Sequence, residues 1–244
     1  MSEIHDGKEY TEGIAVKGGF LGKLDNFWYH NKWVTIIVSF FLCVGIICTL
    51  QTCSKKKEDL ILVYAGRNTL SATEIEKICS VLENAAPSDF DGDGEKNIAL
   101  STYTVMSEGQ IKEAQKETDA EGRSTFIDGT YISKQYDDYC NYLLTGESSV
   151  LFLDPWLYEN LSSNKRLVKL EDVLGYKPEE ACGEYGVALG KTSLYSEYGV
   201  MRLLPEDTVI CLLQPYVAGK SSKEKFYVRE QEMFRALVGY RTEE

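Results

Sequence analysis

One continuous apolar segment, Trp33–Leu50, constrains this chain of 244 residues more than any other feature. The segment contains no charged residue, and its only hydroxyl side chains are those of Thr35, Ser39 and Thr49. An α-helix rises about 1.5 Å per residue, so this segment spans roughly 27 Å, close to the thickness of the hydrocarbon core of a bilayer. The segment therefore predicts one transmembrane helix, followed by a part of the chain that is long enough for one folded domain.

The residues beside this segment favour a permanent membrane anchor. Phe27–Tyr29 place three aromatic side chains before it, as in the interfacial belt of a membrane helix, and Lys32 can reach the headgroups. A cleaved signal peptide is disfavoured because the preceding region is too long and no small-x-small cleavage site follows. A lipoprotein site at Cys53 is disfavoured because Leu, Gln and Thr precede it instead of small residues. We therefore predict a flexible tail over residues 1–26, a transmembrane region over residues 27–53 and a domain over residues 59–240.

The orientation of the anchor does not follow from the lysines near its two ends. Lys17, Lys23 and Lys32 precede the segment, and three further lysines follow at residues 55–57, so the positive-inside rule favours neither orientation. The tail is short, and long domains cross the membrane with little regard to charge. We therefore expect a cytoplasmic N-terminus and an extracytoplasmic domain at the cell membrane.

The net charge of −12 is concentrated in the domain. The first 32 residues carry four lysines and five acidic residues and the apolar segment carries no charge, which leaves −11 for the rest of the chain. Nucleic-acid binding requires positive charge that releases counterions from phosphates. We therefore expect no nucleic-acid partner, and we interpret the acidic residues mainly as a well-solvated surface.

Strand and helix patterns alternate after residue 59. Leu60–Ala65 is a continuous apolar run, which is typical of a strand buried on both faces. Ser71 and Glu74 form a capping box that begins a helix, and apolar residues then recur at helical spacing. Further strands are predicted at residues 98–105, 149–153 and 208–213. Further helices are predicted at residues 107–118, 132–143, 171–174 and 224–238, and a short helix is predicted to begin at Pro155. The chain before Gly190 is predicted to be irregular. The pattern predicts an α/β domain with a mainly parallel sheet and flanking helices, preceded by a single transmembrane helix.

Catalytic side chains are scarce in this domain. Both histidines, His5 and His30, precede it, so a serine triad lacks its base and a zinc site lacks a common ligand. No serine lies in a GxSxG motif. The seven cysteines contain no CxxC pair, and those of the domain are far apart, so we expect free thiols. The sequence predicts no enzymatic activity.

The segment Asp89–Asn97 matches the first half of a calcium-binding loop. Carboxylates occupy loop positions one, three and five and a glycine occupies position six, which brings several oxygen ligands together around a tight turn. The pattern breaks at position twelve, where Leu100 replaces the acidic residue that binds with both oxygens. The alternative is a plain turn between a helix and a strand, in which Asp and Gly are favoured for their backbone conformation. The candidate calcium ligands are Asp89, Asp91, Asp93, Glu95 and Asn97.

A second candidate site lies at the carboxyl ends of the predicted parallel strands, where ligands bind in open α/β sheets. The residues at these ends are Gly66, Arg67, Asn68, Tyr103, Thr104, Asp154 and Trp156. Arg67 can hold an anionic group, and Trp156 can stack on a ring. Alternatively, Asp154 caps the following helix and Trp156 belongs to the core. The candidate ligand-binding residues are Arg67, Asn68, Tyr103, Asp154 and Trp156.

Several segments resemble extracellular solute-binding proteins of bacterial ABC transporters. They are DLILVYAG (59–66), SATEIEKICSVLENA (71–85), DFDGDGEKN (89–97), YLLTGESSVLFLDPWLYENL (142–161) and RLVKLEDVLG (166–175). In that family a glycine, a buried strand and an aspartate lead into a helix, and a leucine precedes a second Leu-x-Asp loop. Gly146, Leu151–Asp154, Leu167 and Leu170–Asp172 fill these positions.

The entrance FWYHNKW (27–33) is similar to that of single-span membrane proteins of clostridia-like bacteria. Solute-binding proteins close two lobes over a ligand, whereas this chain has room for one lobe, with the resemblance covering residues 59–175. The resemblance therefore implies a fold more than a function.

Three functional hypotheses follow. The first is a membrane-anchored extracytoplasmic binding or interaction module, which contacts the bilayer through Trp33–Leu50 and has a small molecule or a membrane protein as partner. The second is an accessory or sensing subunit docked on another membrane protein. The third is a metal-dependent enzyme. A pocket beside Arg67 and Trp156 would favour the first, a flat apolar patch the second, and further carboxylates near Asp89–Asn97 the third.

Overall fold

The computed structural model describes residues 20–53, 57–116, 127–215 and 221–239, which form two compact units divided after Lys56. The first unit contains helix α1, Phe20–Cys53. It begins before the predicted start at residue 27, so residues 20–26 are helical although they were assigned to the tail. Leu21, Lys23 and Leu24 have good helix propensity, and this offsets the single glycine among them. Residues 1–19 of the predicted tail lie outside the described residues.

Within α1, Phe27–Leu50 is long and apolar enough to cross a membrane. It is the one such segment among the residues that the structure describes. Its large apolar side chains are exposed, including those of Trp33 and Phe41. A helix that is apolar on all sides is typical of contact with lipid or of a buried position. This helix is compatible with a single-span membrane protein.

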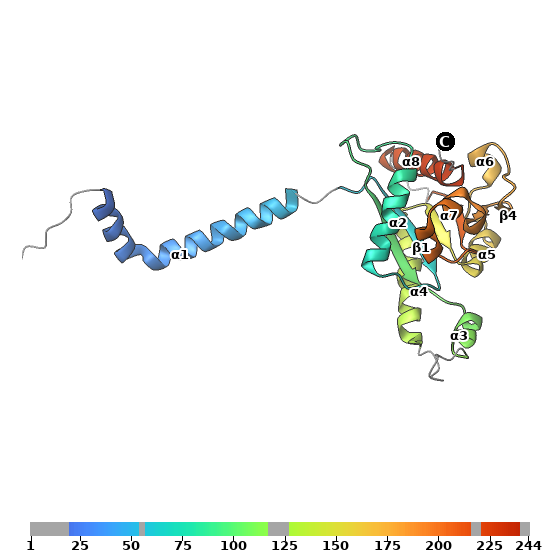
Figure 1. Ribbon diagram of the computed structural model, residues 1–244, viewed down its shortest axis with the longest axis horizontal. Coiled ribbons are helices and arrows are strands. Elements are labelled where there is room, and N and C mark those ends of the chain that lie inside the picture. Colours follow the sequence, from blue (N-terminus) through green and yellow to red (C-terminus); the bar gives the residue numbers. More distant parts are fainter. Residues whose placement is uncertain (1–19, 54–56, 117–126, 216–220, 240–244) are drawn as a thin grey trace, which may run out of the picture. The chain divides into compact units, whose positions relative to one another are not determined.

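The second unit, Lys57–Glu244, is a mixed α/β domain (Figure 1). Its strands are β1 Leu60–Gly66, β2 Ile98–Thr104, β3 Val150–Leu153, β4 Ala181–Cys182, β5 Gly186–Ala188 and β6 Val209–Leu212. Its helices are α2 Ala72–Ala85, α3 Glu108–Ala114, α4 Gly129–Thr145, α5 Pro155–Ser163, α6 Leu170–Leu174, α7 Ser193–Glu197 and α8 Ser221–Val238, with 3₁₀ turns η1 Leu189–Lys191 and η2 Gly199–Leu203.

The six strands form one sheet in the order β2-β1-β3-β6-β5-β4. The pairs β1–β2 and β1–β3 are parallel, whereas β3–β6, β6–β5 and β5–β4 are antiparallel. The prediction of a mainly parallel sheet is therefore wrong, because three of the five strand pairs are antiparallel. Between β3 and β6 the chain forms several short helices and the β4–β5 hairpin instead of one crossover helix, and β6 enters the sheet in the opposite direction.

Alternating side chains of the central strands enter two separate cores. Leu62 and Tyr64 of β1 pack on one face with α2, α6, α7 and α8, and Val63 and Ala65 pack on the other face with α4 and α5. Figure 1 shows helices on both sides of the sheet. Because both faces are covered, the central strands are apolar at every position, which explains the continuous run in the sequence.

Local sequence signals set most helix boundaries. Ser71 and Glu74 form the predicted capping box of α2, and Ser107 forms a second one with Gln110 at α3. α4 ends at Gly146, whose φ of 63° lies in the left-handed region that glycine adopts without strain. The helix predicted to run to residue 118 ends at Ala114, and residues 117–126 lie outside the described part of the chain.

Candidate functional site

The predicted binding edge contains an ionic cluster around Arg67. The guanidinium group donates to both oxygens of Asp207, with Nη2–Oδ1 and Nη1–Oδ2 distances of 2.7 and 3.0 Å. Its Nη1 also lies 3.3 Å from Oδ2 of Asp154. The hydrogen bonds to Asp207 raise the pKa of Arg67. The cluster therefore joins the end of β1, the end of β3 and the turn before β6.

Asp154 is the buried member of this cluster, with 3% of its side chain exposed. Its Oδ1 accepts a hydrogen bond from the amide of Trp156, which confirms the predicted cap of α5. Its Oδ2 accepts a hydrogen bond of 2.8 Å from Nε2 of Gln110, a residue of α3 that the sequence did not assign to this edge. Asp154 thus has donors from three other elements, and its charge is well compensated.

The other predicted ligand-binding residues make structural contacts of their own. Nδ2 of Asn68 donates to the carbonyl oxygen of Leu203 at 2.8 Å. The ring of Tyr103 packs between those of Tyr139 and Tyr142 on α4. Trp156 stacks on Tyr136, also on α4, with a centroid distance of 5.9 Å. Arg67 and Asp154 therefore lie together, Tyr103 and Trp156 both pack on tyrosines of α4, and Asn68 binds the end of η2.

Replacing Arg67 by methionine is expected to lower the free energy of unfolding by about 2 kcal/mol, because Asp154 would lose its cation while remaining buried. Asp207→Asn is the matched control: Asp207 is 45% exposed, and an exposed ion pair contributes about 1 kcal/mol at most. Urea denaturation of residues 57–244 would measure both changes. If both variants lowered the free energy of unfolding equally, the buried charge of Asp154 would not depend on Arg67.

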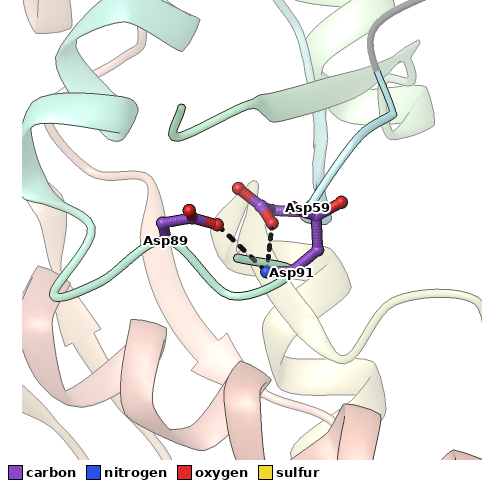
Figure 2. A group of neighbouring side chains, drawn as sticks. All are labelled: Asp59, Asp89 and Asp91. Carbon is purple, nitrogen blue, oxygen red and sulfur yellow. Dashed lines mark hydrogen bonds between the residues drawn. The ribbon is translucent and has the colours of Figure 1, made fainter. Parts of the chain in front are cut away.

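The carboxylates that lie close together at the acidic loop are not the same set that the sequence predicted. Carboxylate oxygens of Asp59, Asp89 and Asp91 lie within 4.8 Å of one another (Figure 2). Asp59 directly precedes β1 and was not predicted. Asp93 and Glu95 are not members of this group among the described residues, and the backbone amide of Asn97 donates to Asp59. Asp89 and Asp91 of the loop and Asp59 before β1 therefore form one group of three carboxylates.

Backbone amides already bind these carboxylates. Asp89 accepts hydrogen bonds of 2.7 Å from the amides of Gly92 and Gly94, which lower its pKa. Asp59 accepts 2.8 and 3.0 Å bonds from the amides of Asp91 and Asn97. These bonds fix the backbone of the loop, as is usual in turns rich in Asp and Gly.

We expect the melting temperature of residues 57–244 to be the same in millimolar calcium and in excess chelator. The loop is held by its own hydrogen bonds, and Leu100 at the twelfth position is buried in β2, where it provides no oxygen ligand. Differential scanning calorimetry would test this expectation. An increase with calcium that is lost in an Asp89→Asn, Asp91→Asn variant would contradict it and assign a metal site to the loop.

Two pockets flank the sheet at opposite ends of the parallel strands. One, of about 560 Å³, lies beside the predicted edge and is lined by residues that include Tyr158, Lys191, Glu206 and Asp207. The carboxylate of Asp207 is already paired with Arg67. This pocket does not include Arg67 or Trp156, the two side chains predicted to hold a ligand.

The other pocket, of about 380 Å³, lies at the amino ends of β1 and β3. We name it the Glu230 pocket and define it by the apolar residues Leu143, Leu213 and Phe226 and the polar residues Ser149, Arg166 and Glu230. Its volume is within the range of small-molecule sites, and such sites are usually apolar with a few placed polar groups. The sequence did not predict this pocket, whose described lining comes from five segments distant in the chain.

Glu230 is buried, with 3% of its surface exposed. Its Oε1 accepts a hydrogen bond of 2.5 Å from the amide of Ser149. Burial raises the pKa of Glu230 to about 7, although the hydrogen bonds from Ser149 lower it. Among the described residues, no lysine or arginine forms an ion pair with this carboxylate. A carboxyl group with such a shifted pKa in a pocket is a recognised mark of a functional site.

One sequence signal could have identified Glu230. It occupies a position of α8 from which Met233, Phe234 and Leu237 follow at intervals of three, four and seven residues, and all three are buried. An acidic residue on the apolar stripe of a helix is buried by the fold. The partners Ser149 and Arg166 carry no such signal, because their places depend on tertiary packing.

Comparison of this chain with protein-family models, with curated proteins and with solved structures finds no match. The resemblance to solute-binding proteins therefore depends on the quoted sequence segments alone.

Proposed function

We propose that this chain is a single-span membrane protein whose α/β domain is an extracytoplasmic binding module without catalytic activity. The observation that carries the proposal is the Glu230 pocket, which combines apolar walls with a buried carboxyl group. An apolar pocket of this size with a perturbed titratable group is the usual form of a small-molecule site. The helix Phe27–Leu50 supports the membrane anchor. A relation to one lobe of a solute-binding protein, in a clostridia-like bacterium, belongs to the same proposal.

Two alternatives have less support. Docking as an accessory or sensing subunit calls for a flat apolar patch. The large exposed apolar side chains of the described domain lie on separate elements: Tyr131, Tyr136 and Leu144 on α4, Tyr176 after α6 and Val228 on α8. A metal-dependent enzyme needs further ligands at the acidic loop, whose carboxylates accept hydrogen bonds from backbone amides.

Thermal unfolding with a ligand panel tests the binding function. The full chain, purified in detergent, would be heated with sugars, peptides, amino acids, organic acids and amines. A ligand at about a hundred times its Kd adds about 2.7 kcal/mol to the stability of the folded state, which corresponds to an increase of roughly 5–10 °C in Tm for a domain of this size. If no member of the panel changes Tm, the small-molecule binding function is refuted.

Protease treatment of intact cells tests the orientation. The proposal expects external protease to digest the domain while leaving the N-terminal tail protected. Protection of the domain in intact cells, with digestion only after lysis, would refute the extracytoplasmic assignment.

A further inference from the structure

The three buried carboxyl groups among the described residues differ in how many donors they have. Asp154 has donors on Arg67, Gln110 and Trp156, and Asp59 accepts from two backbone amides. Within the described part of the chain, Glu230 accepts from the amide and the hydroxyl group of Ser149 and, unlike Asp154, from no cationic group. A buried carboxylate with so few donors is costly. Because Glu230 also lines a pocket, a ligand in that pocket can supply the cationic donor that no described residue provides.

The charges of the pocket favour a cationic ligand. Among the residues that the structure describes, its lining contains two carboxyl groups, Glu147 and Glu230, and one guanidinium group, Arg166. With Glu230 ionised, the described lining residues carry a net negative charge. The chain after the anchor carries a net charge of −11. An acidic domain attracts cations and concentrates them near such a pocket. The aromatic rings of Phe226 and Tyr227 add faces that attract a cation.

We propose that the Glu230 pocket binds a small organic cation, an amine whose ammonium group donates to the carboxylate of Glu230 and whose apolar body lies against Leu143, Leu213 and Phe226. This inference rests on the proposed binding function and names the class of its ligand. The apolar walls select against small hydrated ions, because they offer no hydrogen bonds in place of water. The pocket volume of about 380 Å³ limits the ligand to a small molecule.

Binding of the amine is coupled to release of a proton. The protonated carboxyl group of Glu230 gives up its proton as the ammonium ion enters, and the product is a carboxylate–ammonium pair with one H⁺ released to solvent. With a pKa of about 7, Glu230 is protonated in about half of the molecules near neutral pH. The amine therefore binds more tightly as the pH rises, with a change of about 25-fold between pH 5.5 and pH 7.5.

Other charged or titratable groups also face this carboxylate. They are Glu147 between α4 and β3, Arg166 between α5 and α6, Tyr142 on α4 and Tyr227 on α8. Burial raises the pKa of both tyrosines. A variant that changes Glu230 alone separates its contribution from that of these groups.

Isothermal titration calorimetry with four matched probes tests the inference. 2-Phenylethylamine, 2-phenylethanol, 3-phenylpropanoate and phenylalanine share an apolar ring and differ in charge. With the full chain in detergent, we expect the amine to bind at least about 10-fold more tightly than the other three, because one charge-assisted hydrogen bond contributes this much. In buffers of different ionisation enthalpy, the apparent binding enthalpy should differ, which reports the released proton.

Two variants complete the test. Glu230→Gln should weaken amine binding at least about 10-fold and abolish both the pH dependence and the proton release. Glu232→Gln makes the same substitution at an exposed position of α8 and should leave binding unchanged. Equal binding of the alcohol or the propanoate, or undiminished amine binding by Glu230→Gln, would overturn the inference while leaving a binding function in place. Failure of all four probes and of the wider ligand panel would instead refute the binding function itself.

Discussion

Replacing Phe234 by alanine is expected to lower the free energy of unfolding of the domain by about 3–5 kcal/mol. The Phe234 side chain is fully buried in the core on the α2 face of the sheet. α8 packs there against α2, α6, β3 and β6, so the cavity left by the ring would be enclosed on several sides. Such a site collapses little, and the loss approaches the upper end of the range for truncated aromatic residues.

The loss is large compared with the total stability of a domain, which is typically about 5–15 kcal/mol. It should lower the Tm of residues 57–244 by roughly 10 °C. Val228→Ala is the matched control, because Val228 lies on the same helix and is 47% exposed; its truncation should cost less than about 0.5 kcal/mol. Urea denaturation of both variants measures the difference. If the two losses were similar, α8 would not be part of the core.

The elements that the sequence predicts well are those determined by adjacent residues. The apolar run Leu60–Ala65 becomes the central strand β1, and the capping box of Ser71 and Glu74 begins α2. Asp154 caps α5 and Gly146 ends α4. In each case, the hydrogen bond or backbone conformation involves residues within a few positions of one another, so the sequence contains the whole signal.

The direction of the strands and the short second hairpin depend on distant contacts. β4 and β5 contain two and three residues, which is too short for a periodic pattern to be recognised. They exist because β5 pairs with β6, more than twenty residues later in the chain. The alternation of strands and helices predicts an α/β domain but not whether each strand runs parallel to its neighbour.

The candidate sites also contain some residues that could be predicted from the sequence and others that depend on distant contacts. The residues at the ends of β1 and β3 were predicted to lie at one edge, and the contact between Arg67 and Asp154 agrees with this placement. Asp207, which binds Arg67 with both oxygens, was not predicted, because it precedes an antiparallel strand. The Glu230 pocket was missed for a related reason: its walls come from segments that meet only in the folded domain.

Replacing Glu230 by glutamine is expected to stabilise the domain at pH 8 by about 3 kcal/mol. Glutamine has nearly the same shape, and its side-chain oxygen can still accept the hydrogen bond from the amide of Ser149. It removes the cost of keeping a carboxylate buried with few donors, since glutamine carries no charge. A residue whose isosteric replacement stabilises the fold has been retained for another purpose, as expected for a binding site.

The pH dependence of this gain follows from the raised pKa of Glu230. The carboxyl group has a pKa of about 7 in the folded domain and about 4.3 in the unfolded chain. Below pH 4 both states are protonated, so the variant and the natural domain should have similar stability. Between these two pKa values the unfolded state loses its proton first, and the stability that protonated Glu230 confers falls as the pH rises until the folded state also ionises. The difference between Glu230→Gln and the natural domain should therefore grow from pH 4 to pH 7 and remain constant above it.

Urea denaturation of both proteins at intervals of one pH unit would measure this difference. A constant difference across the range would contradict the burial of an ionisable Glu230, whereas the expected increase would show that the fold keeps a destabilising carboxylate at the pocket.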